Sequence, residues 1–150
     1  MHAQLTVTPA QLPEVLLNAA VVRPVFLWGA PGIGKSSLVR EFAASLGLDC
    51  VSLLGTAAAS ARRSRSPVTS RTACSSGGLN AAAPDVQKAF YSLILDRRIG
   101  SYELPPGSVV IGAGNRATDQ ALARPMASAL VNRLVHVHLR ASSADWLTWR

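Results

Sequence analysis

One motif constrains the fold of this chain more than any other feature: Gly29-Ala30-Pro31-Gly32-Ile33-Gly34-Lys35-Ser36 matches the pattern G-x-x-x-x-G-K-[ST] at every fixed position. The motif follows Val25–Trp28, an apolar run typical of a strand that is buried on both faces of a parallel sheet. Residues 35–46 come next, with apolar side chains at helical spacing, and Gly47 ends that helix. With a further strand expected over 48–54, this order predicts a βαβ unit.

The residue types of the motif are those that a phosphate-binding loop needs. Glycines allow positive φ and a close approach of the backbone to phosphate oxygens. Consecutive N–H groups then form an anion nest at the N-terminus of the helix. Lys35 supplies a positive charge for the β- and γ-phosphates, and the hydroxyl of Ser36 suits Mg²⁺. A chance glycine-rich turn is the alternative, but the strand before and the helix after the motif argue against it. The residues expected to bind a nucleotide are Gly29, Ala30, Pro31, Gly32, Ile33, Gly34, Lys35, Ser36 and Ser37.

The rest of the chain predicts a series of helices and strands. They are a helix over 10–20 with Thr8 as its cap and Pro9 in its first turn, a helix over 84–96, a hairpin arm over 99–104 with a turn at 105–107, a strand over 108–113, a helix over 124–132, a strand over 134–139, and a helix that begins at Ser142 or Ser143. We expect an α/β fold with a parallel sheet flanked by helices, as a single domain over 1–150.

Residues 57–78 differ from the rest of the chain, because they show no apolar periodicity of either kind and we expect them to be irregular. They contain Arg62, Arg63, Arg65 and Arg71 and no acid, so these four arginines account for more than half of the net charge of +7. Such a segment favours a solvated loop. Without interleaved aromatic residues it does not predict base stacking, and nucleic-acid binding is the less favoured interpretation.

Composition excludes several classes of protein. With 49% hydrophobic and 15% charged residues, the chain is neither a disordered tail nor a charged coiled coil. No apolar stretch of about 18 residues is free of charges and turn signals, so no membrane-spanning helix is expected. The N-terminus lacks the basic leader of a secretory signal. Cys50 and Cys74 form neither a metal motif nor a disulfide framework, and a cytoplasmic protein is expected.

Three later segments resemble parts of a known family. The stretch KAFYSLILDRRIG (88–100) looks like a helix that runs into an extra β-hairpin. The stretch VVIGAGNR (109–116) looks like a fourth strand that ends in a polar residue, and ALVNRL (129–134) looks like a segment that carries an arginine finger. Together with the phosphate loop they resemble the AAA+ ATPases, and within them the MoxR-like group and its dynein-related neighbours. The resemblance covers about 21–55 and 81–149.

The resemblance implies roles for two polar residues. Asn115 matches the residue called sensor 1, which would orient a water against the γ-phosphate. Its place at a strand end fits that role, and an ordinary turn residue is the alternative. Arg133 matches the arginine finger, which would act in trans in the site of a neighbouring subunit. A cation that interacts with a helix C-terminus is the alternative.

His136 and His138 alternate on one face of the last expected strand. Two imidazoles at this spacing can share a metal ion, but the sequence shows no third ligand nearby. The polar face of an edge strand is therefore the favoured interpretation.

The family pattern is incomplete at its third strand. Family members end that strand with an Asp-Glu pair, which serves Mg²⁺ and the attacking water. Here Gly77 and Gly78 precede Leu79-Asn80, and the apolar strand before them is absent too, so we expect a third strand that is missing or disrupted around 57–78. An out-of-frame coding segment and natural divergence both explain the pattern. The chain also stops before the helical lid of the family.

The resemblance implies an ATP-binding AAA+ ATPase of the chaperone or remodelling type, with ATP and Mg²⁺ as its cofactors and Ser36 as the Mg²⁺ ligand. It implies a homo-oligomeric ring, a hexamer, that works on a protein client such as one with a von Willebrand A-like domain, without a membrane and without nucleic acid. Because the acidic pair is absent, we expect impaired hydrolysis. A non-hydrolysing nucleotide-binding fragment or structural subunit, and a nucleic-acid-dependent NTPase, are the alternatives.

Overall fold

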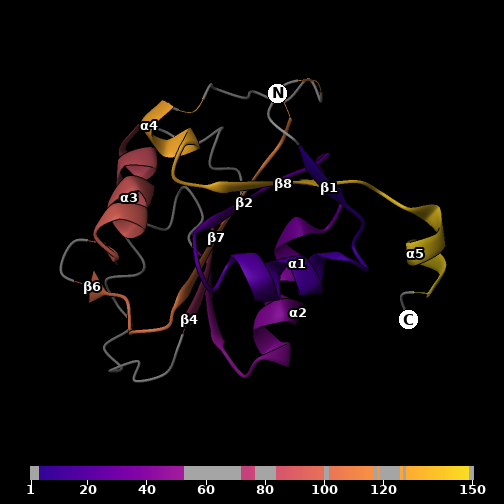
Figure 1. Cartoon of the computed structure of the whole chain (residues 1–150), viewed down its shortest axis with the longest axis horizontal. Coiled ribbons are helices and arrows are strands. Elements are labelled where there is room, and N and C mark those ends of the chain that lie inside the picture. The colour runs from indigo at the N-terminus through magenta and orange to yellow at the C-terminus, as the bar shows by residue number, and fades with distance from the viewer. Residues whose placement is uncertain are drawn as a thin grey trace.

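The computed structural model describes residues 4–52, 72–76, 84–99, 102–116, 118, 126 and 128–148. Figure 1 shows the helices and strands of these ranges, which follow the order β1 (Leu5–Val7), α1 (Leu12–Ala19), β2 (Val25–Trp28), α2 (Lys35–Ser45), β3 (Asp49–Ser52), β4 (Thr72–Ser76), α3 (Pro84–Leu95), β5 (Arg98–Ile99), β6 (Tyr102–Glu103), β7 (Val109–Gly114), α4 (Ser128–Val131), β8 (Val135–Leu139) and α5 (Ser143–Thr148). Within these ranges no helix is long and apolar enough to cross a membrane.

Six strands form one sheet in the order β1-β8-β2-β7-β4-β3, and every neighbouring pair is parallel. β2 lies inside the sheet, with Val25 opposite Ile111 of β7 on one side and Val135 of β8 on the other. After β2 the chain passes through α2 to β3 at one edge, whereas β8 and β1 lie on the opposite side of β2. The strand order therefore reverses at β2. Open α/β sheets bind ligands in the crevice at the carboxyl ends of such strands.

The central strands bury side chains in two cores on opposite faces of the sheet. Val25 and Leu27 of β2 pack with residues of α1 and α2, while Phe26 packs with residues of α3 and α4. Figure 1 shows α1 and α2 together on one side of the sheet and α3 with α4 on the other. A strand covered on both faces needs a continuous apolar sequence, which explains the residues VFLW of β2.

Gly112 of β7 lets the second core close against the sheet. A Cβ atom at this position would lie 2.7 Å from Cδ2 of Phe26 and 3.0 Å from Cζ of Phe90. Both aromatic side chains are buried, with 0% and 3% of their surfaces exposed, so neither ring has open space to move into. Close packing, rather than a positive φ, therefore requires glycine here.

The structure confirms the expected fold class, a parallel sheet flanked by helices. β2 has its predicted bounds. α2 begins at Lys35 as predicted and ends at Ser45, one residue earlier than expected and two before Gly47, which has a φ of 65°. The strands expected over 108–113 and 134–139 are present as β7 and β8, each beginning one residue later than predicted. The helix expected over 84–96 is α3.

The prediction of an irregular segment over 57–78, with a missing or disrupted third strand, is wrong for residues 72–76. These residues form β4, which lies inside the sheet and is parallel to both β3 and β7. Its sequence TACSS has no hydrophobic alternation, so the pattern that predicts strands is absent. Pairing with two neighbours defines the strand instead, as expected where tertiary context overrides propensity. The rest of the segment, 57–71 and 77–78, lies outside the described residues.

Two predicted boundaries also need correction. α1 begins at Leu12 rather than at residue 10, because a turn precedes it in which the N–H groups of Gln11 and Leu12 both donate to the carbonyl of Thr8 at 3.1 Å. The hairpin lies wholly within residues 98–103, where β5 and β6 are antiparallel. The turn expected at 105–107 is present, closed by a bond from Ser108 N–H to the Pro105 carbonyl at 3.1 Å, but it leads into β7.

β1 is an element that the sequence patterns do not predict. It pairs in parallel with β8, with Thr6 opposite His138. Since β8 also pairs with β2, it is an interior strand, and the prediction that His136 and His138 lie on an edge strand is wrong. The helix expected over 124–132 is present in part as α4, which ends at Val131, and residues 124, 125 and 127 lie outside the described ranges.

Candidate nucleotide-binding site

The loop from Gly29 to Gly34 follows the carboxyl end of β2. Its first residue is tied to the neighbouring strand, because the N–H of Gly29 donates to the carbonyl of Gly114 at 3.2 Å. Gly29 is also packed closely: a Cβ atom there would lie 3.4 Å from Cγ2 of Ile33 and 3.4 Å from Cβ of Leu139. The start of the loop is therefore fixed between the ends of β7 and β8.

Two glycines shape the rest of the loop through their backbone conformation. Gly32 has a φ of 77° and Gly34 a φ of 89°, both in the region that side-chain-bearing residues rarely adopt. No atom lies within 4 Å of a Cβ built at either position, so backbone conformation and not crowding requires glycine. Gly34 is also the N-cap of α2, where a glycine has no side chain to cap the helix. The first N–H groups of a helix have no partner within it, and an anion suits them.

The side chain of Lys35 lies against the loop. Its ammonium donates to the carbonyls of Gly29 at 2.9 Å and Ala30 at 2.8 Å, and to Oδ1 of Asn115 at 3.1 Å. The side chain is half-buried, so the charge faces the loop rather than bulk water. The structure thus places a fixed positive charge between the phosphate loop and the end of β7.

Asn115 follows directly after β7, at the carboxyl end of a strand that pairs with β2. The structure therefore brings together Lys35 and Asn115, which lie 80 positions apart in the chain. The structure places Asn115 at the end of β7 and within hydrogen-bond distance of Lys35. Its role toward an attacking water stays a prediction.

Ser36 and Ser37 occupy the first turn of α2, where Ser36 is half-buried and Ser37 exposed. The described part of the chain places no acidic residue directly after the strands that surround the loop. The acids in the described elements and turns are Glu14 in α1, Glu41 in α2, Asp49 at the start of β3, Asp85 at the start of α3, Asp96 just after α3, Glu103 in β6 and Asp145 in α5. None of these follows the carboxyl end of β2, β4 or β7. Nor do the described residues include a group of three or more His, Cys, Asp or Glu that could hold a metal ion.

Arg133 lies just after α4 and is exposed. Its Nη1 donates to the carbonyl of Ala129 in that helix at 2.7 Å. This contact is the helix-terminal interaction that the sequence offers as the alternative to an arginine finger. An exposed guanidinium also has the freedom to reach a second molecule, so the contact does not decide between the two roles.

A hydrogen-bonded pair that sequence reasoning missed lies beside the loop. The indole Nε1–H of Trp28 donates to Nδ1 of His136 at 2.9 Å, and Nε2 of His136 lies 2.8 Å from the carbonyl of Val131. Because Nδ1 accepts, the proton belongs on Nε2, which then donates to that carbonyl. Both His136 and His138 also stack on the indole, at centroid distances of 6.0 and 6.2 Å. The pairing links the strand before the loop to the end of α4.

Solved structures similar to this chain include the Holliday junction branch migration motor RuvB of Thermotoga maritima, with 22% identity and a TM-score of 0.61 over 88% of this chain and 44% of RuvB. A single-residue variant of that RuvB has 21% identity and a TM-score of 0.60, over 87% of this chain and 43% of the other. A candidate ATPase of Cytophaga hutchinsonii has 18% identity and a TM-score of 0.68, over 93% and 48%. No protein-family model matches the sequence, and no curated protein matches it.

These similarities show the fold, a parallel sheet flanked by helices, which this chain shares with the matched structures. The chain spans less than half the length of each of these structures. The expected fold class is thereby confirmed, and the comparisons assign the chain neither to the AAA+ proteins nor to the MoxR-like group within them.

Proposed function

We propose that this chain is the nucleotide-binding core of an AAA+ ATPase and that Gly29 to Ser37 bind ATP with Mg²⁺. The observation that carries the proposal is the loop geometry at the carboxyl end of β2. The loop holds two glycines with positive φ, the second of them the N-cap of α2, and the ammonium of Lys35 lies against its first two carbonyls. Backbone N–H groups and one lysine are the donor set that suits the β- and γ-phosphates of a nucleotide.

Lys35 would exchange partners when ATP binds. Its partners include two neutral carbonyls and a neutral amide oxygen, those of Gly29, Ala30 and Asn115. A phosphate oxygen is a charged acceptor and forms a stronger bond with an ammonium than a neutral oxygen does. The carbonyls of Gly29 and Ala30 therefore hold the lysine close to the place where the phosphates would lie. Their bonds to the ammonium are weaker than the bonds that phosphate oxygens would form.

Ser36 would hold Mg²⁺ together with the phosphate oxygens, and the metal ion would neutralise charge on the phosphates. Asn115 already contacts the lysine that would bind the γ-phosphate. In this position its side chain would orient the attacking water.

We also propose that the active form is a homo-oligomeric ring, a hexamer, in which Arg133 acts on the site of the neighbouring subunit. The exposure of Arg133 supports this, because a residue that works in trans must be accessible. By resemblance to the MoxR-like group, the ring would work as a chaperone or remodelling machine on a protein client, such as one with a von Willebrand A-like domain.

A nucleic-acid-dependent NTPase is the second candidate. The observation that favours it is the similarity in fold to RuvB, which is a Holliday junction branch migration motor, together with the net charge of +7. Stimulation of ATP turnover by DNA or RNA that disappears at high salt would support this candidate. Stimulation by a protein client would support the first.

Titration with a fluorescent ATP analogue tests the site. Lys35→Ala should remove a charge-assisted contact worth about 1.5–3 kcal/mol and weaken binding about ten- to a hundredfold. Lys88→Ala is the matched control, because it removes the same charge from an exposed position on α3. Ser36→Ala should reduce the gain in affinity that Mg²⁺ provides. If Lys35→Ala binds as tightly as Lys88→Ala and both are folded, the loop is not the site.

A further inference from the structure

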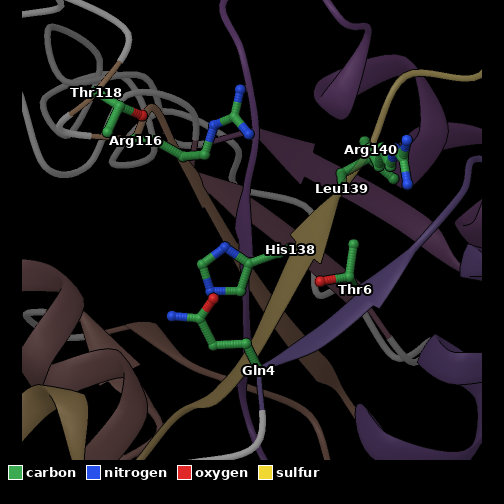
Figure 2. Close-up of a pocket in the computed structure, with 7 residues that line it drawn as sticks. All are labelled: Gln4, Thr6, Arg116, Thr118, His138, Leu139 and Arg140. Atoms are coloured by element: carbon green, nitrogen blue, oxygen red, sulfur yellow. The ribbon is translucent and has the colours of Figure 1, made fainter.

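A second pocket lies on the sheet face of β1 and β8 that is turned away from α1 and α2. Val7 of β1 and Val137 of β8 point into the core beneath α1 and α2, so alternate residues such as Thr6 and His138, which are directly opposite each other, point to the other side. The cavity there has a volume of about 420 Å³. It is lined by Gln4, Thr6, Arg116, Thr118, His138, Leu139 and Arg140, as Figure 2 shows.

The lining combines positive charge with hydrogen-bond donors. Three basic side chains line the cavity (Figure 2). Arg116 lies in the segment after β7, His138 lies in β8, and Arg140 directly follows β8. Among the residues that the structure describes, no carboxylate lines it. The remaining polar side chains are two hydroxyls and one amide, which also donate hydrogen bonds. A guanidinium presents a planar fork that fits an oxyanion with two parallel bonds.

The electrostatics of His138 agree with a cationic cavity. Burial lowers the pKa of its imidazole, and the neighbouring His136 and the positive charge of Arg116 lower it further. His136 also lies on β8, and Trp28 of β2 stacks on the ring of His138 without adding charge. A bound anion would oppose the effect of Arg116 and favour the imidazolium form.

We propose that this pocket binds a compact oxyanion, a phosphate or carboxylate group, between the guanidinium groups of Arg116 and Arg140. The site is distinct from the phosphate loop, because neither Lys35 nor any residue of the loop lines it. The two sites share one wall, since Leu139 lines the pocket and also packs next to Gly29. The proposal does not depend on nucleotide binding at the loop.

An NMR titration of the full chain with inorganic phosphate tests the proposal. The imidazole signals of His138, assigned with the variant His138→Gln, report on the pocket and not on the loop. We expect a saturable change in these signals and a rise in the pKa of His138, so phosphate binds more tightly as the pH falls through that pKa. The same result is expected in Lys35→Ala, which disables the loop. Sodium chloride at equal ionic strength is the reference for charge screening.

Arg116→Gln and Arg140→Gln, each at an exposed position, should weaken phosphate binding at least about tenfold, because each removes a charge-assisted contact. Arg23→Gln is the matched control, since it removes the same charge from an exposed position before β2, at the opposite end of that strand from the loop. It should leave the affinity for phosphate unchanged. Arg140→Lys keeps the charge without the fork and should lie between Arg140→Gln and the unaltered chain.

A parallel titration with malonate distinguishes the two sources of the oxyanion. Stronger binding of phosphate would indicate a phosphorylated ligand, and stronger binding of malonate would indicate a carboxylate ligand. Both results support the proposal if they depend on Arg116 and Arg140. It is overturned if neither anion shifts His138 more than chloride does, or if Arg23→Gln weakens binding as much as the two pocket variants do.

Discussion

Gly112→Ala is the substitution whose effect on stability follows most directly from the structure. The new methyl group would lie 2.7 Å from Cδ2 of Phe26, 3.0 Å from Cε2 of the same ring and 3.0 Å from Cζ of Phe90. These distances are shorter than a carbon–carbon contact at its optimum of about 3.5–4.0 Å. Both rings are buried in the core beneath α3, so relief requires a shift of the rings or of the helix.

The expected magnitude combines two opposing effects. Overpacking of a well-packed core costs about 1–3 kcal/mol. Replacement of glycine by alanine also restricts the unfolded chain, which stabilises the folded state by about 0.4–1 kcal/mol. We therefore expect the free energy of unfolding to fall by about 1–2 kcal/mol. For a chain of this size that corresponds to a decrease in Tm of about 2–8 °C.

Urea unfolding followed by circular dichroism measures the change, and a shift in midpoint without a change in slope identifies an effect on stability. The matched comparison is the same substitution in a Phe26→Leu background. With the ring removed, Gly112→Ala should cost less than about half as much, since the two residues are in contact and their effects are coupled. An unchanged or raised stability for Gly112→Ala, or an equal loss in both backgrounds, would refute the packing argument.

Three further substitutions test other parts of the structure. Gly34→Ala should lower the free energy of unfolding by about 1–2 kcal/mol and weaken ATP binding, because alanine is strained at a φ of 89° even where its Cβ meets no neighbour. Equal stability of the variant and the unaltered chain in urea would contradict this. Trp28→Phe should cost about 1 kcal/mol beyond the lost ring area, since it leaves Nδ1 of His136 without its donor, and His136→Phe in the same background should then add little. Arg133→Ala should change the ATP affinity of the monomer by less than about twofold, because the Arg133 side chain bonds to the neighbouring helix α4 and not to the phosphate loop. It should reduce turnover only in the assembled ring. Loss of ATP binding by the monomer would indicate a structural role for Arg133.

The phosphate loop and its two flanking elements could be predicted because their signals are local. Continuous apolar residues identify β2, and the glycines mark the turns in which φ must be positive. The position of Asn115 could be predicted by one general rule, that carboxyl ends of parallel strands meet at one edge of the sheet. Because β2 and β7 end at the same edge, Asn115 after β7 can accept a hydrogen bond of 3.1 Å from Lys35.

Features that depend on the strand order could not be predicted from local patterns. β4 has the sequence TACSS, without alternation or bulk, and only its two neighbours make it a strand. The bond between Trp28 and His136 joins residues 108 positions apart, and it exists because β8 lies next to β2. A sequence signal was present in the pair of histidines, but an edge strand and an interior strand with one polar face give the same alternation.

The presence of β4 sharpens the expectation that this chain binds ATP better than it hydrolyses it. Phosphoryl transfer depends on the positioning of charged groups, and the carboxylates that serve Mg²⁺ and water follow the third strand in the resembling family. Here β4 ends at Ser76, level with Gly112 of β7, and the next two residues in the sequence are Gly77 and Gly78.

We therefore expect turnover far below about 1 per second, the lower end for related phosphoryl-transfer enzymes, in an assay of phosphate release at saturating ATP and Mg²⁺. The double substitution Gly77→Asp and Gly78→Glu should raise turnover, because it places the two carboxylates directly after a strand that is already formed. Gly77→Asn with Gly78→Gln is the matched control, since it adds side chains of the same size without the charges. Turnover at or above about 1 per second in the unaltered chain would mean that another group takes the place of the acids. An equal gain from the amide pair would mean that bulk and not charge is what these positions lack.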